Sequence, residues 1–107
     1  EVEILVAEVG HTTDGDRLFH ILYDGTVVDE SDFTVLGGEA EAIAKRLGEA
    51  WGEGLSLADA LKAAAKAIGG PDRTLLADDL EVAVLARSNG RRAFRRIEDA
   101  ELAELLA

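Results

Sequence analysis

The sequence contains no cysteine and no methionine among its 107 residues, and only one proline. Without cysteine it has no disulfide, no thiolate metal ligand and no cysteine nucleophile, a composition that fits a reducing compartment and favours a cytoplasmic location. It also lacks an apolar run of 18 residues and a basic leader, so we expect no membrane partner. A strand pattern is already running at Val2, so we expect a processed chain or a piece of a longer one.

Basic residues are scarce, since 11 Lys and Arg stand against 22 Asp and Glu, with a formal net charge of −11. Such a surface repels nucleic acid and anionic membranes unless its basic side chains are gathered in one place. Five of the 11 are gathered, in the segment RSNGRRAFRR: Arg87, Arg91, Arg92, Arg95 and Arg96. Arginine suits bidentate ion pairs, so we interpret this segment as a candidate interface, paired with acidic residues of this chain or of a neighbour. Nucleic acid is not an expected partner, because binding it needs a broader positive field.

Side chains suited to catalysis are few. His11 stands in a polar turn and is expected to be solvated, whereas His20 stands mid-strand and is expected to be a packed histidine. Serine occurs three times, and Ser56 is explained as a helix cap. No serine stands in a GxSxG turn, so no nucleophile with its base is predicted, and we expect no catalytic residue.

Metal and cofactor motifs are also missing. The acidic segments at 29–32 and 77–79 are turn-like and lack the ligand spacing of an EF-hand, so we predict no metal site. Gly37 and Gly38 precede a helix and could hold an anion, but neither a P-loop lysine nor a GxGxxG pattern accompanies them. Glu39 and Glu41 in the first helical turn would repel a phosphate. We therefore interpret the glycine pair as a joint that lets the helix leave the sheet closely, with no cofactor.

Hydrophobic periodicity predicts strands and helices that do not strictly alternate, which is typical of an α+β fold. The expected strands are 1–9, 17–23, 26–30, 32–38, 80–86 and 91–97, and the expected helices are 38–51, 56–68 and 99–106. Asp24-Gly25 predicts a type I′ hairpin turn, and Asn89-Gly90 predicts a second hairpin. Ser56 is the expected cap of the second helix, with Asp59 three residues on, and Asp99 that of the third.

The expected strands require more cover than the chain supplies. Strand 1–9 is apolar on both faces, which indicates a strand covered on both sides. One layer of amphipathic helices covers only one face of a sheet. The simplest remedy is a second sheet packed face to face, contributed by residues outside this chain or by another copy.

Four segments together resemble the C-terminal half of an actinobacterial proteasome α subunit: EVEILVAEVG, RLFHILYDGTVVDESDFTVLGG, SLADALKAAAKAI and LEVAVLARSNGRRAFRRIEDAELAELL. The resemblance runs over nearly all of the chain, and its strongest markers are the YDG…GG segment and the C-terminal ending. It implies one partial domain over 1–107, half of an N-terminal-nucleophile-hydrolase-like αββα sandwich of four layers, in which the other half supplies the second sheet.

The resemblance also implies a function. Subunits of this type form a heptameric, non-catalytic end ring of the 20S core particle, which gates substrate entry. Their partners are neighbouring α subunits, the β ring and an ATPase activator, so a homo-oligomer is expected. The gate and most of the activator pocket lie in the other half of the family's fold, and no residue here corresponds to them.

Two alternatives remain open from the residues alone. The first is a catalytic β-type fragment, which would need an N-terminal threonine; position 1 is Glu1, and Thr12 and Thr13 are internal. The second is a free-standing interaction domain that dimerises through its open sheet. We expect poor solubility or sheet-to-sheet association of the chain alone, because an uncovered apolar face is an aggregation liability.

Overall fold

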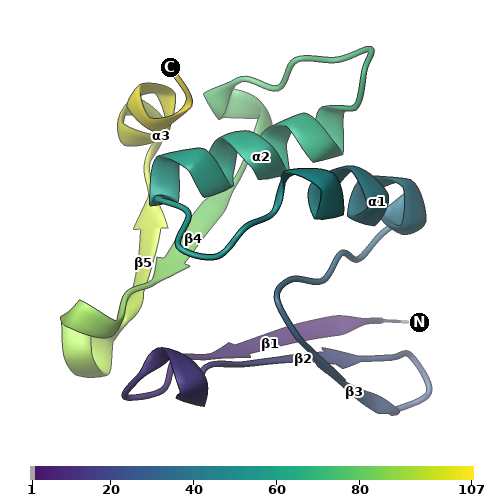
Figure 1. Cartoon of the computed structure of the whole chain (residues 1–107), viewed down its shortest axis with the longest axis vertical. Helices are drawn as coiled ribbons and strands as arrows, with labels where there is room; N and C mark the ends of the chain where they lie inside the picture. Colours follow the sequence, from purple (N-terminus) through teal and green to yellow (C-terminus); the bar gives the residue numbers. More distant parts are fainter. Residues whose placement is uncertain (1) are drawn as a thin grey trace. The chain divides into compact units, whose positions relative to one another are not determined.

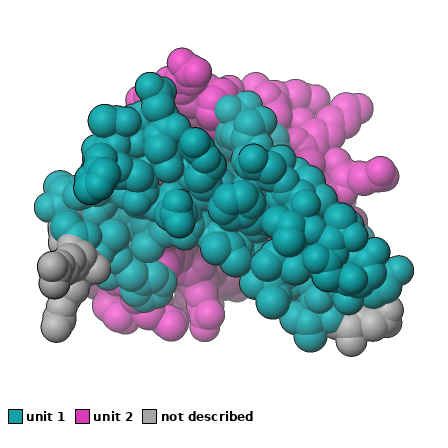
Figure 2. All heavy atoms as spheres, turned by 90° about the horizontal axis from the view of Figure 1, so that it is seen from below, with its two compact units in different colours: residues 1–38, 84–95 teal, residues 39–83, 96–107 magenta. Residues whose placement is uncertain are grey.

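The computed structural model describes residues 2–107, apart from the side chains of Asn89, Arg91 and Arg92. Over these residues it contains α-helices and antiparallel strands, which confirms the α+β class (Figure 1). The chain divides into two compact units (Figure 2). Unit 1 comprises residues 1–38 and 84–95, and unit 2 comprises residues 39–83 and 96–107. The expectation of one partial domain over 1–107 stays a prediction.

Unit 1 contains a three-stranded antiparallel sheet in the order β1-β2-β3. Its strands are β1 (Ile4–Glu8), β2 (Arg17–Ile21) and β3 (Val27–Glu30), drawn in purple to blue in Figure 1. His20 stands opposite Leu5 on one side and Val28 on the other. The apolar and β-branched content of these segments therefore predicted the strands, with ends a few residues too long.

The turn between β2 and β3 differs from the predicted type I′ turn. Of its residues only Gly25 has a positive φ, at 92°, whereas a type I′ turn needs positive φ at both central positions. The Gly25 N–H donates to Leu22 O at 2.9 Å, and the Leu22 N–H donates to Thr26 O at 2.8 Å. The connection is therefore a three-residue loop ending in a left-handed glycine. Asp24 stabilises it by accepting from the Thr26 N–H at 2.9 Å, a bond that lowers the pKa of its carboxyl.

The strand predicted at 32–38 does not form. Asp32 has a φ of 55°, and the Phe33 N–H donates to Ser31 O, so the chain turns sharply where the strand would begin. No strand of the described residues is paired with this segment, and a strand-like pattern without a neighbouring strand forms no hydrogen-bond ladder.

The prediction of close packing at the glycine pair is also wrong. A Cβ at Gly37 or Gly38 would meet nothing within 4 Å, and only Gly37, with a φ of 115°, needs to be glycine.

Unit 2 is built on two helices that contact each other, α1 (Ala40–Ala50) and α2 (Leu57–Gly69). Ser56 caps α2 as predicted, since its Oγ accepts from the Asp59 N–H at 3.1 Å. Arg46 on α1 donates from Nε to Ala67 O at 2.8 Å, which satisfies a carbonyl in the last turn of α2. Within the part of the chain that the structure describes, no helix is both long and apolar enough to cross a membrane.

The C-terminal segment forms a two-stranded sheet and a third helix. Strands β4 (Val82–Leu85) and β5 (Phe94–Ile97) pair, and helix α3 (Asp99–Leu106) follows. The division between the two units falls within β4 and β5. The predicted second hairpin forms, but a 3-10 segment, η3 (Arg87–Arg92), connects its strands in place of a turn made by Asn89 and Gly90 alone. Asp99 is not the cap of α3 either; it is the first helical residue, after Glu98.

Burial is concentrated in unit 2. The buried hydrophobic residues among those described are Ala65, Ala67, Ile97 and Leu102, and Leu102 is 0% exposed. All of them belong to unit 2. Helix α3 contacts both α2 and the short 3-10 turn η2 (Ala77–Asp79), so Leu102 lies at the centre of this small core. Unit 1 therefore has its hydrogen-bonded sheet without a fully buried side chain among the described residues.

Candidate functional site

Strand β1 carries the apolar surface that the sequence indicated. It is the first strand of the β1-β2-β3 order and so lies at an edge of the sheet. Ile4 is 48% exposed and Val6 40% on one face, while Leu5 is 45% exposed on the other. Exposed apolar side chains that gather on one element mark a surface for interaction. This exposure agrees with the expectation that strand 1–9 needs cover from outside the chain, which stays a prediction.

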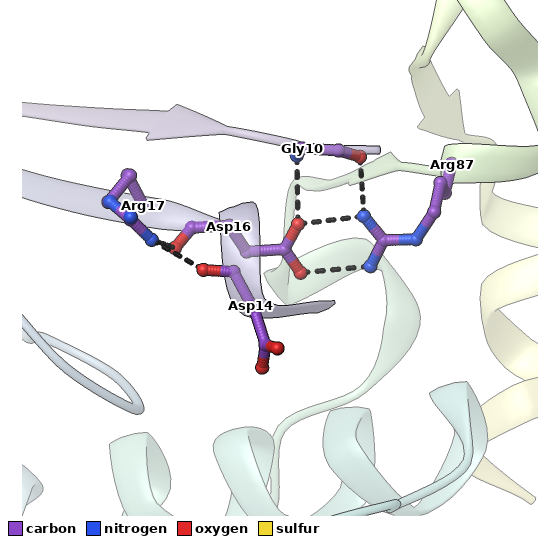
Figure 3. Close-up of polar contacts among 5 residues, drawn as sticks. All are labelled: Gly10, Asp14, Asp16, Arg17 and Arg87. Atoms are coloured by element: carbon purple, nitrogen blue, oxygen red, sulfur yellow. Dashed lines mark hydrogen bonds and ion pairs between the residues drawn. The ribbon is translucent and has the colours of Figure 1, made fainter. Parts of the chain in front are cut away.

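A polar cluster in unit 1 brings together the β1–β2 connection and the first residue of η3 (Figure 3). Arg87 Nη1 donates to Asp16 Oδ1 at 2.8 Å, and Nη2 donates to Asp16 Oδ2 at 3.0 Å. The same Nη1 donates to Gly10 O at 2.6 Å, and the Gly10 N–H donates to Asp16 Oδ1 at 2.9 Å. The planar guanidinium matches the carboxylate in the bidentate geometry that arginine favours.

The electrostatics of this cluster follow from its hydrogen bonds. The hydrogen bond from Arg87, and then that from the Gly10 N–H, lower the pKa of Asp16 from 3.8 to about 2. The carboxylate in turn raises the pKa of the Arg87 guanidinium. Both groups are thus held in their charged forms throughout the ordinary pH range, so the cluster acts as a fixed ion pair and offers no group for proton transfer.

The other arginines of the candidate interface have different surroundings. Arg96 Nη2 lies 3.5 Å from Glu81 Oε1, with side chains that are 59% and 85% exposed. Arg95 also has an interaction partner. The side chains of Arg91 and Arg92 lie outside the described residues. Pairing within the chain, one of the two interpretations of the segment, is therefore confirmed for Arg87 and Arg96, and an interface role for all of these arginines stays a prediction.

The histidines take the places that the sequence indicated. His20 lies on β2 with a side chain that is 16% exposed, and its Nε2 lies 3.0 Å from Glu3 Oε2. His11 is exposed in the connection between β1 and β2. Among the described residues, no group of three or more His, Asp or Glu side chains is arranged to hold a metal ion.

Sequence reasoning missed Asp16 and Gly10. Their partner Arg87 was singled out, but Asp16 and Arg87 are 71 residues apart, and no local pattern connects them. The one feature of the sequence that could have indicated this cluster is the glycine at position 10. A Cβ there would lie 2.6 Å from the backbone of Gly15, so the turn closes too tightly for any other residue.

The sequence of the chain matches a known protein family. The family model described as "Proteasome subunit" matches residues 1–84. Curated relatives called proteasome subunit alpha match over almost the whole chain. The one from Acidothermus cellulolyticus is 49% identical over 99% of this chain and 47% of its own length. The one from Kineococcus radiotolerans is 46% identical over 100% of this chain and 49% of its own length.

The relative from Xylanimonas cellulosilytica is 45% identical over 95% of this chain and 46% of its own length. The chain thus spans about half the length of the curated relatives it matches. The resemblance seen in the YDG…GG segment and the C-terminal ending is confirmed by these matches. With a family match that covers most of its residues, the chain belongs to the proteasome subunit family.

Proposed function

We propose that the chain is the C-terminal half of an α-type, non-catalytic subunit of a 20S proteasome core particle. The observation that carries the proposal is the agreement of the relatives, which are called proteasome subunit alpha and match 95% to 100% of this chain. These names favour the α type over the catalytic β-type alternative. The subunit would form the heptameric end ring that gates substrate entry, in the cytoplasm.

The exposed strand β1 supports the part of the proposal that concerns the missing half. Its apolar side chains are 40% to 48% exposed on both faces of an edge strand, an arrangement that exposes the chain to aggregation. In the proposed subunit, a second sheet from the other half packs on the first at about 10 Å, as in other sheet-on-sheet folds. The free-standing interaction domain would leave this surface for a second copy.

The fixed ion pair supports a structural rather than a catalytic role for the conspicuous polar residues. Asp16 and Arg87 satisfy each other and the backbone of Gly10, so neither is available to act on a substrate. Neighbouring α subunits, β subunits and an ATPase activator are the proposed partners. The arginine-rich segment 87–96 is the proposed contact surface of this chain toward the acidic side chains of a neighbouring subunit.

A chimera tests the proposal. The corresponding C-terminal segment of the Acidothermus cellulolyticus relative is replaced by this chain, and the chimera is expressed with and without proteasome β subunits. We expect native mass spectrometry to show sevenfold rings that bind β subunits, and we expect peptide hydrolysis only when β subunits are present. A chimera that folds but stays monomeric would contradict the ring proposal. Hydrolysis by the chimera alone, blocked by a threonine-directed inhibitor, would favour the catalytic alternative.

A further inference from the structure

The cluster of Gly10, Asp16 and Arg87 closes a ring of hydrogen bonds within unit 1. Gly10 donates to Asp16, and Arg87 donates both to the Asp16 carboxylate and to the Gly10 carbonyl (Figure 3). Each of the three residues is therefore held by the other two. The ring ties together two segments of unit 1 that are remote in sequence, since Asp16 and Arg87 are 71 positions apart.

The β1–β2 side of the ring contains further hydrogen bonds that do not involve Arg87. The Gly15 N–H donates to Thr12 O at 2.9 Å, which closes the 3-10 turn η1 (Thr13–Gly15). Arg17 Nη1 donates to the carbonyls of Asp14 and Asp16, at 2.8 and 2.9 Å (Figure 3). These bonds hold the backbone around Asp16, and the Gly10 N–H donates to its carboxylate.

The other side of the ring belongs to a weaker element. Strands β4 and β5 have four residues each and form a sheet of only two strands. An isolated two-stranded ribbon is marginally stable in water. The Ala86 N–H donates to Ala93 O at 2.9 Å, and Arg87 directly follows this closing bond as the first residue of η3. The hydrogen bonds of Arg87 to Gly10 and Asp16 therefore hold the chain at the point where the β4–β5 connection begins.

We propose that the Gly10–Asp16–Arg87 cluster is a conformational lock, which holds η3 against the β1–β2 connection so that the two connections open and close together. The lock holds the backbone of η3, which is the first part of the arginine-rich segment 87–96, in one preformed orientation. A partner that binds a preformed turn does not bear the entropic cost of ordering it. This inference concerns only the chain's own geometry and does not depend on the proposed function.

Two backbone amides report on the lock, one on each side of it. The Gly10 N–H donates to Asp16, and the Ala86 N–H closes the β4–β5 connection. Hydrogen exchange of both amides is measured by NMR in the wild type, Asp16→Asn, Arg87→Lys and the double variant. Lysine keeps the charge of Arg87 but cannot reproduce the planar, two-nitrogen pairing of the guanidinium with the carboxylate. We expect each single variant to speed exchange of both amides by about tenfold or more, and the double variant to add little.

The control is Arg73→Lys, which alters an exposed pair in unit 2, 3.6 Å from Asp79, and should leave both amides unchanged. Amides of α2 should keep their protection in every variant. The lock is overturned if each single variant affects only the amide on its own side, or if the two effects add fully. If a variant unfolds, the wild type alone tests the lock. The lock requires that the protection factors of the Gly10 and Ala86 amides agree within about threefold, and a larger difference overturns it.

Discussion

Replacing Leu102 by alanine tests the assignment of the core to unit 2. Leu102 is the only fully buried large side chain among the described residues, at 0% exposure. It lies on α3, which contacts both α2 and the η2 turn. Truncation at this position therefore removes the buried side chain of α3.

The size of the effect follows from burial. A buried Leu→Ala change costs about 2–5 kcal/mol, of which the transfer of the lost methyl and methylene groups is one part and the residual cavity the other. A chain of this length has a free energy of unfolding of about 5–15 kcal/mol, and sparse burial favours the lower part of that range. We expect Leu102→Ala to lower the free energy of unfolding by about 3 kcal/mol, which lowers Tm by roughly 12 °C or more.

Urea denaturation followed through the single tryptophan, Trp51, measures this change. The matched control is Leu76→Ala, which removes the same atoms from a side chain that is 62% exposed and should cost less than about 1 kcal/mol. If Leu102→Ala cost no more than Leu76→Ala, the position of the core described above would be refuted.

The remaining predictions concern single side chains and are measured by the same denaturation assay. Ser56→Ala removes the cap of α2 and should lower stability by about 1 kcal/mol; no loss would mean that the cap bond does not form in solution. Gly10→Ala places a methyl group 2.6 Å from the backbone of Gly15 and should cost about 1–3 kcal/mol, whereas Gly38→Ala, with open space, should not. The folded pKa of Asp16, about 2, lies below its unfolded value near 3.8. Its contribution to stability is therefore present above about pH 4 and lost as the pH falls toward 2, so the stability difference between wild type and Asp16→Asn should vanish over that interval. A difference that persists unchanged at pH 2 would contradict this assignment.

Local signals in the sequence predicted much of the secondary structure. Ser56 predicted the start of α2 because a cap is a bond between near neighbours. Short runs that are apolar on both faces predicted β1 and β2, because such a run is a property of each segment alone. The family resemblance depends only on the order of residues along the chain, and the family match and the curated relatives confirm it.

The wrong or missing predictions arose where the local sequence allows more than one backbone conformation, or where structure depends on remote residues. The segment 32–38 has a strand-like pattern, but Asp32 turns the chain and no described strand pairs with it. The type of the turn at Gly25 depended on whether one or two residues took positive φ, which the Asp-Gly pair alone does not decide. The pairing of Asp16 with Arg87 requires the fold itself, since it joins residues 71 positions apart.

In the proposed subunit, β1 is covered by the half of the fold that lies outside this chain. Hydrogen–deuterium exchange of β1, Ile4–Glu8, in the isolated chain and in the chimera with the Acidothermus cellulolyticus half tests it most directly. We expect slower exchange of these amides in the chimera than in a dilute, monomeric sample of the chain alone, in which β1 pairs with β2 but its apolar faces stay exposed. Equal exchange in the two samples, with the chimera folded, would contradict it.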